Sequence, residues 1–223
     1  MKRAPALVAV AAALLLPGCA STSLNTETYH QRLIQTLPNR RDVSFSEEAI
    51  YAGGVLCGKY TALAENGFTT RTRPFVVTRE QTLRNPDTQE RAIYCSDAPL
   101  EQLGNTLGFR IDETGVGQLQ ELVADFTAVD RAINSYHQAR HSMPETLTAL
   151  RDAGYLASDT ALNDPWGNPY RYKPGLAGRT TPSYRLRTDG ANGEPGGTGE
   201  DSDLTRRHLP VLEHVLSVNN GGA

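Results

Sequence analysis

Residues 188–204 read Thr-Asp-Gly-Ala-Asn-Gly-Glu-Pro-Gly-Gly-Thr-Gly-Glu-Asp-Ser-Asp-Leu, and the chain is organised around this stretch. It holds five acidic side chains, no basic one, and five glycines that permit unusual backbone angles. Because like charges this close repel, the stretch is either a solvated acidic turn or a loop whose oxygens gather around a hard cation such as Ca²⁺. We favour the cation, on grounds that the surrounding sequence supplies.

The composition indicates a globular protein. The chain has 223 residues, of which 39% are hydrophobic and 21% charged, enough for one or two domains with a real core. Its formal net charge is -3, and removal of Lys2 and Arg3 with a leader would give -3 - 2 = -5. This balance gives no support for nucleic-acid binding.

The N-terminus has the layout of a secretory signal. Two basic residues precede an apolar run over 6–16, which is too short to span a bilayer, and Leu16-Pro17-Gly18-Cys19 follows. This ending resembles a bacterial lipobox, although Pro17 is unusual in it. The resemblance implies a signal peptide over 1–18, a lipid on Cys19 and a polar tether over 19–28. Because Ala20 follows Cys19, it also implies an outer-membrane lipoprotein facing the periplasm of a Gram-negative cell. The alternative is an ordinary signal peptide that is cleaved nearby.

The remaining cysteines form an even pair. If Cys19 carries lipid, Cys57 and Cys95 are left in an oxidising compartment, where a disulfide is the default. Such a bridge would contribute roughly 3 to 4 kcal/mol in the chain-entropy model. Two buried free thiols are the alternative.

Residues 29–98 are predicted to form a small α+β module. A helix is expected over 29–37, and strands over 50–60, 73–78 and 92–95 form an antiparallel meander that the two cysteines staple. The glycine-rich segment 99–117 is predicted to be an irregular linker to the second half.

Residues 118–204 show the strongest helical pattern of the chain. Apolar residues recur at spacings of three and four over 119–136, which indicates a long helix covering a sheet, with a partner-binding coiled coil as the alternative. A short helix over 145–156 and a hairpin built from 170–172 and 183–187 follow, with Trp166 expected to pack the helix onto the hairpin. His137 and His141 are spaced for a metal, but no third ligand is evident, so a solvated helix end is the interpretation. Residues 205–223 predict a short helix and tail that caps the domain or docks a partner.

The order of motifs in this half resembles a known family. The motifs are Gly154-Tyr155-Leu156, Asp164-Pro165-Trp166-Gly167-Asn168-Pro169-Tyr170, Tyr184-Arg185-Leu186, Gly190-Ala191-Asn192-Gly193 and Glu200-Asp201-Ser202-Asp203. From about Val123 to Leu204 the chain resembles the globular domain of the G-type major pseudopilin of bacterial type II secretion. The resemblance implies a long helix packed on a small antiparallel sheet, followed by a loop that binds calcium.

The resemblance also implies a set of calcium ligands. Asn192 stands where the family has its first ligand carboxylate, and Asp201 and Asp203 match the later acidic ligands. Carbonyl groups near Asp189 and Thr198 would complete the shell. Asn192 keeps an oxygen but loses a charge, which lowers the expected affinity unless Asp189 restores it.

The N-terminus departs from the family. A pseudopilin has a hydrophobic assembly helix that continues straight into the globular domain, whereas here the apolar run ends at Cys19, about a hundred residues earlier. We therefore expect a structural or interaction protein that binds secretion-system or other envelope components, rather than a filament subunit. An alternative is a small-ligand or glycan module with a pocket lined by Tyr51, Tyr60, Phe75 and Tyr94. An envelope hydrolase is disfavoured, because the carboxylates crowd into one loop and no Ser-His-Asp order is legible.

Overall fold

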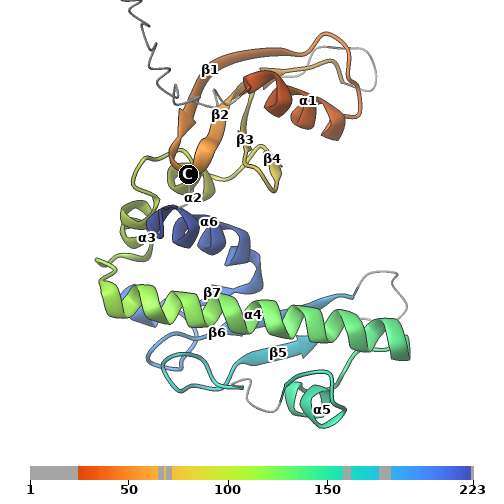
Figure 1. Ribbon diagram of the computed structural model, residues 1–223, viewed down its shortest axis with the longest axis vertical. Helices are drawn as coiled ribbons and strands as arrows, with labels where there is room; N and C mark the ends of the chain where they lie inside the picture. Colours follow the sequence, from red (N-terminus) through yellow and green to blue (C-terminus); the bar gives the residue numbers. More distant parts are fainter. Residues whose placement is uncertain (1–24, 65–67, 69–71, 158–161, 176–181, 222–223) are drawn as a thin grey trace, which may run out of the picture.

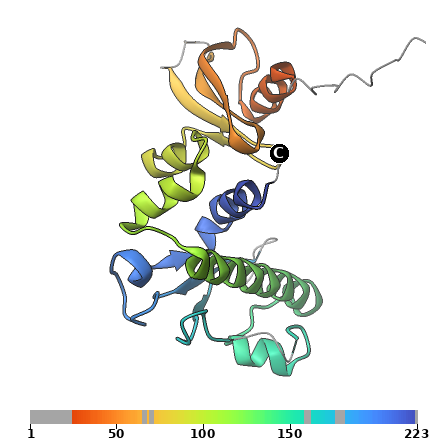
Figure 2. The ribbon, with the colours of Figure 1, turned by 60° about the vertical axis from the view of Figure 1, so that its left-hand side comes forward.

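The computed structural model describes residues 25–64, 68, 72–157, 162–175 and 182–221, so the signal segment and Cys19 lie outside the described residues. The fold is α+β, as expected, and its elements are stacked in layers (Figures 1 and 2). One antiparallel sheet carries α1, a middle layer holds α2, α3 and α6, and α4 lies over a second small sheet.

The N-terminal sheet is an antiparallel meander in the order β1-β2-β3-β4, made of Ser44–Tyr51, Val55–Thr61, Arg73–Val77 and Thr82–Arg84. The continuous strand expected over 50–60 is instead a hairpin, because Gly53 and Gly54 have φ of 73° and 69° and turn the chain. Helix α1 (Thr26–Thr36) covers one face, where Leu33 packs with Phe75 in a small core.

Two expectations for residues 92–117 were wrong. The third strand, predicted over 92–95, is helix α2 (Thr88–Tyr94), which begins with reciprocal hydrogen bonds between Asp87 and Glu90. The segment 99–117, expected to be irregular, contains helix α3 (Pro99–Leu107), which ends at Gly108 with φ of 89°.

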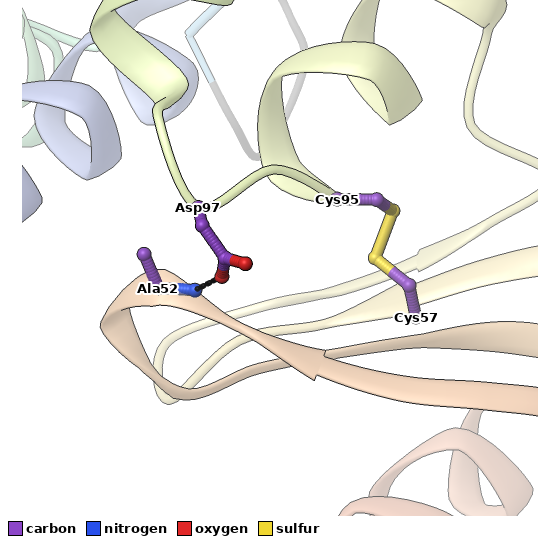
Figure 3. The surroundings of a disulfide bond; sticks show 4 residues. All are labelled: Ala52, Cys57, Cys95 and Asp97. Atoms are coloured by element: carbon purple, nitrogen blue, oxygen red, sulfur yellow. Dashed lines mark hydrogen bonds between the residues drawn. A yellow bond between two sulfur atoms is a disulfide. The ribbon is translucent and has the colours of Figure 1, made fainter.

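The disulfide between Cys57 and Cys95 is confirmed. It joins strand β2 to the residue that ends helix α2, so it fixes this helix to the sheet (Figure 3). Beside it, the carboxylate of Asp97 accepts a hydrogen bond of 3.2 Å from the backbone N–H of Ala52, which tethers the β1–β2 turn to the same segment (Figure 3).

The C-terminal half has the predicted long helix on a small sheet. Helix α4 spans Glu113–Arg140, α5 spans Leu147–Asp152, and the antiparallel sheet has the order β5-β6-β7. Its strands are Arg171–Pro174, Tyr184–Thr188 and Leu204–Thr205. Tyr170 joins helix to sheet: its ring packs against Phe126, and its hydroxyl donates to Asp125 at 2.7 Å. Trp166, expected in that role, is only partly buried and lies outside the main core.

Helix α6 (Leu209–Asn219) lies between the two halves (Figure 2). Its Leu212 and Val215 are fully buried in one core that also contains Val55 and Val76 of the N-terminal sheet and Leu122 of α4. The helix predicted for the tail is therefore the element through which the two halves pack. Among the described residues, no helix is long and apolar enough to cross a membrane.

Candidate functional site

The acidic stretch forms a closed loop between two paired strands. It leaves β6 after Thr188 and returns at Leu204 of β7, and these two residues are register partners. A short 3-10 turn over Gly199–Asp201 lies within it. Because both ends are fixed in the sheet, the loop is held at its base.

Glycines allow the two sides of the loop to touch. Gly190 has φ of 67°, and a Cβ placed on it would lie 2.6 Å from the carbonyl oxygen of Glu200. At Gly197, with φ of 117°, a Cβ would lie 2.5 Å from the carbonyl oxygen of Asp201. Both distances are too short for any side chain, so these two positions require glycine.

The Asp-Pro-Trp-Gly-Asn turn holds the loop in place. The Asn168 side chain donates to the carbonyl oxygens of Gly190 at 2.8 Å and Ala191 at 3.2 Å. Asp164, which is buried, accepts from the backbone N–H of Asn168 at 2.8 Å and from the Thr188 hydroxyl. Asp164 and Asn168 were predicted only as parts of a turn. The signal in the sequence that could have predicted their hydrogen bonds to the loop is that these polar side chains flank Pro-Trp-Gly.

Asp189 is bound by arginines of the sheet. Its side chain is only 2% exposed, with Arg171 Nε at 2.7 Å from Oδ2 and Arg187 Nε at 3.0 Å from Oδ1. The Asp189 carboxylate in turn raises the pKa of the Arg171 guanidinium. The predicted restoring ligand is therefore already neutralised by two cations, and its contribution to a metal shell would run through its backbone carbonyl.

The carboxylates of Asp203 and Asp201 differ in the hydrogen bonds and ion pairs they make. Asp203 accepts from the Gly196 N–H at 3.0 Å and from Arg187 Nη1 at 3.2 Å, which closes the end of the loop. The Asp201 carboxylate makes no hydrogen bond or ion pair with any described residue, while its backbone N–H donates to the Thr198 carbonyl at 3.3 Å. Of the two predicted acidic ligands, Asp201 is thus the one whose carboxylate has no other partner among the described residues.

Asn192 lies at the exposed tip of the loop. Its side-chain oxygen accepts from the Glu194 N–H at 2.9 Å, which forms a local turn. Within the described ranges, no group of three His, Cys, Asp or Glu side chains converges as a metal cluster. The oxygens available for Ca²⁺ are therefore a mixture of carboxylate, amide and carbonyl, the oxygen donors that Ca²⁺ accepts.

The histidine pair does not form a comparable site. His137 is buried on α4. His141 ends that helix, and its backbone is in the left-handed conformation with φ of 52°. The prediction of a solvated helix end is confirmed for His141, which is exposed, and is wrong for His137, which is buried. No metal-binding group of His, Cys, Asp or Glu side chains is found among the described residues.

The aromatic side chains proposed to line a ligand pocket are mostly in the cores. Phe75 and Tyr60 pack against α1, and Tyr94 packs in the main core beside His214. Burial at 1% to 5% exposure leaves these three rings no free face for a ligand.

One protein-family model matches the C-terminal half of the chain. Residues 111–207 match the family model described as type II secretion system (T2SS), protein G. The match begins two residues before α4 and ends after β7, so it covers the long helix, the second sheet and the acidic loop. It covers less than half of the chain and leaves out the disulfide-linked module and α6. No curated protein matches the chain. The C-terminal half is therefore a pseudopilin G-like domain, which connects the chain with type II secretion.

Proposed function

We propose that the chain is a lipid-anchored envelope protein whose pseudopilin-like domain binds other secretion components, in a role accessory to the filament. In this proposal Cys19 carries the lipid, residues 19–28 are a tether, and the protein lies on the periplasmic face of the outer membrane. Calcium stabilises the domain through its acidic loop, and the role is structural, as in the matched family.

The start of α4 is the observation that carries the accessory role. Asp112 caps this helix by accepting from the Gly115 N–H at 2.9 Å. Ahead of the cap, the chain turns back through Phe109 and Gly108 into α3, which packs against α6. The family resemblance implies an assembly helix that runs straight into the domain, and a capped start is incompatible with that continuity. A domain built this way suits a partner of the secretion apparatus better than a subunit stacked along its filament.

The loop geometry supports the calcium part of the proposal. Asp201 and Asp203 supply carboxylates, Asn192 an amide oxygen, and Asp189 and Thr198 backbone carbonyls, all within one glycine-braced loop. Calcium bound there would supply charge neutralisation, and the binding free energy would add to folding. The burial of Tyr60, Phe75 and Tyr94 favours a protein partner over an aromatic-lined glycan pocket.

Cell fractionation of a type II secreting host tests the function. We expect the wild-type chain in the outer-membrane fraction and absent from sheared surface filaments, and Cys19→Ser to shift it to the soluble periplasm. Cys57→Ser with Cys95→Ser is a control that alters the folded part but leaves the anchor. Recovery of the chain as a regular component of sheared filaments would contradict the accessory role, and unchanged membrane association of Cys19→Ser would contradict the anchor.

A further inference from the structure

The outer face of the β5-β6-β7 sheet is strongly basic. Strand residues alternate between faces, and Tyr172, Tyr184 and Leu186 pack on the side of α4. The opposite face of the same two strands therefore presents Arg171, Lys173, Arg185 and Arg187. Arg207 follows β7 and lines a groove together with Lys173 and Arg185. Arg206 lies on the other side, where it binds Asp130 of α4 and covers the Tyr184 ring. We call Arg171, Lys173, Arg185, Arg187 and Arg207 the basic face.

The register places like charges opposite one another. Arg171 pairs with Arg187, and Lys173 pairs with Arg185. Like charges directly across a strand pair destabilise a sheet, so such a face needs neutralisation.

Carboxylates of the chain neutralise only part of the basic face. Asp189 sits between Arg171 and Arg187, and Asp203 also binds Arg187. No described carboxylate pairs with the remaining three cations, which are Lys173, Arg185 and Arg207. Five cations less two carboxylates leave an excess of three positive charges on a chain whose net charge is -3. The unpaired charge is therefore local and faces outward.

A groove of about 1400 Å³ is lined by cations of this face, Lys173, Arg185 and Arg207 among them, and also by side chains of the α4 side such as Tyr184. It is larger than the roughly 300 to 1,000 Å³ that small-molecule sites occupy. Strand β5 is at the edge of the sheet, and no described strand pairs with its other side. An extended segment that lies over β5 and β6 on this face meets Lys173 and Arg185 together, because these two residues are register partners.

The neighbouring acidic loop restricts what can bind. It starts directly after β6, and Glu194 and Glu200 are exposed on it. A membrane plane or a long anionic polymer that covered the basic face would also meet this negative loop, and repulsion would oppose it. A short acidic segment that lies along β5 and β6 avoids the loop.

We propose that the basic face binds an extended acidic segment of a partner protein, with Lys173, Arg185 and Arg207 as the cations that meet its carboxylates. The inference deepens the interaction role proposed above by giving the chemistry of the partner. Since it concerns the sheet and not the anchor or the loop metal, it is tested separately from them.

The test is fluorescence polarisation with a labelled peptide of four Glu-Ser repeats, and a Gln-Ser peptide as the neutral control. We expect saturable binding of the acidic peptide, weakened by salt and equal with or without chelator. Lys173→Glu, Arg185→Glu and Arg207→Glu together should weaken it more than tenfold. A matched variant, Arg41→Glu with Arg73→Glu and Arg84→Glu, makes the same charge change at exposed arginines of the other half, which pair with no described carboxylate, and should bind normally.

Each outcome decides the proposal. Should the charge-reversed variant fail to fold, as judged by circular dichroism, Lys173→Gln with Arg185→Gln and Arg207→Gln takes its place. Absence of saturable peptide binding, or equal loss in the matched variant, would overturn the proposal. Vesicles of phosphatidylglycerol or an anionic polysaccharide that bound as tightly, with loss in the same variant, would assign the face to lipid or polymer instead. None of these outcomes bears on the anchor or on the calcium loop.

Discussion

His214 is a titratable side chain placed inside the interface between the two halves. Its ring lies 4.9 Å from that of Tyr94, it contacts the β1–β2 turn at Gly53, and its Nε2 is buried without a hydrogen-bond partner among the described residues. Burial lowers the pKa of the His214 imidazole below its ordinary 6.5, and nearby Glu80 opposes that shift only in part. The folded chain therefore prefers the neutral ring.

This preference predicts a loss of stability in mild acid. The unfolded chain takes up the proton at a higher pH than the folded chain, so stability is present above about pH 6.5 and falls as the pH drops toward the lower folded pKa. We expect His214→Phe to reduce the fall in melting temperature between about pH 7.5 and about pH 5.5. A remainder will persist, because desolvation also lowers the pKa of His208.

The control is His141→Asn, at an exposed residue whose φ of 52° asparagine tolerates. Its melting temperature should depend on pH as in the wild type. If His214→Phe and the wild type show the same pH dependence of melting temperature, His214 is not the cause of the loss of stability in mild acid.

Single residues also show where sequence reasoning stops. The Cys57–Cys95 pair was predictable, because two cysteines in an oxidising compartment have one partner each. The arginine partners of Asp189 were not predictable, since they depend on the register that sets Arg171 opposite Arg187. Asp189 lies in an acidic run and was therefore interpreted as a cation ligand, although its carboxylate neutralises two arginines of the sheet.

Among the elements, the loop over 188–204 makes the calcium proposal measurable. Calcium at about 100 times its Kd stabilises a protein that binds it only when folded by about 2.7 kcal/mol. For a chain of this size that corresponds to a rise of about 5 to 10 °C in melting temperature. We expect chelator to remove this increment, and Asp201→Ala to abolish most of it at little cost to the calcium-free protein, because its carboxylate is unpaired. Asp203→Ala should lose the increment and also destabilise the calcium-free form, because it releases Arg187 and Gly196.

The control within the same loop is Glu194→Ala with Glu200→Ala, which removes two exposed charges that are not proposed ligands. This variant should keep the calcium increment. If the wild-type melting curve is the same in chelator and in calcium, the loop is a solvated acidic turn.

Helix signals were present in the sequence where strands or a linker were predicted. Residues 92–95 are Ala-Ile-Tyr-Cys, a composition typical of strands, but Asp87 and Glu90 start a helix that runs through them. In the segment 99–117, Pro99 lies at the start of a helix and Gly108 at its end, the usual positions of these residues. The long helix α4 was predicted correctly because its periodicity extends over many residues. The β5–β6 hairpin was predicted correctly because apolar and charged side chains alternate in both of its short strands.

At the scale of the whole molecule, one core spans the disulfide-linked module and the pseudopilin-like domain. Leu212 of α6 is fully buried there, with residues of β2, β3 and α4. The two halves predicted from sequence periodicity are therefore joined by packing. A one-dimensional pattern does not reveal this, since the joining helix is the last described element and lies far in sequence from β2 and β3.

A shared core predicts unfolding in one transition. Trp166, the only tryptophan, reports on the C-terminal half, and far-ultraviolet circular dichroism reports on the whole chain. We expect the two signals to change together during denaturation. Leu212→Ala should lower the free energy of unfolding by about 2 to 5 kcal/mol and shift both signals equally.

The comparison is Leu33→Ala, which creates a cavity in the separate small core under α1. Its effect should fall on circular dichroism more than on Trp166 fluorescence if that core melts locally. Two well-separated transitions in the wild-type chain would show that the halves are energetically independent.

The position of α6 in the sequence also affects when the protein can complete its folding during synthesis. Every other described element precedes this helix in synthesis, yet Leu212 and Val215 complete the core that those elements share. A growing chain that lacks α6 keeps Val55, Val76 and Leu122 without their final cover, so the native state forms only after this last helix has emerged. Completion of this core is thereby deferred until all the described elements have been synthesised, and a chain that has not yet folded can still be threaded through an export channel.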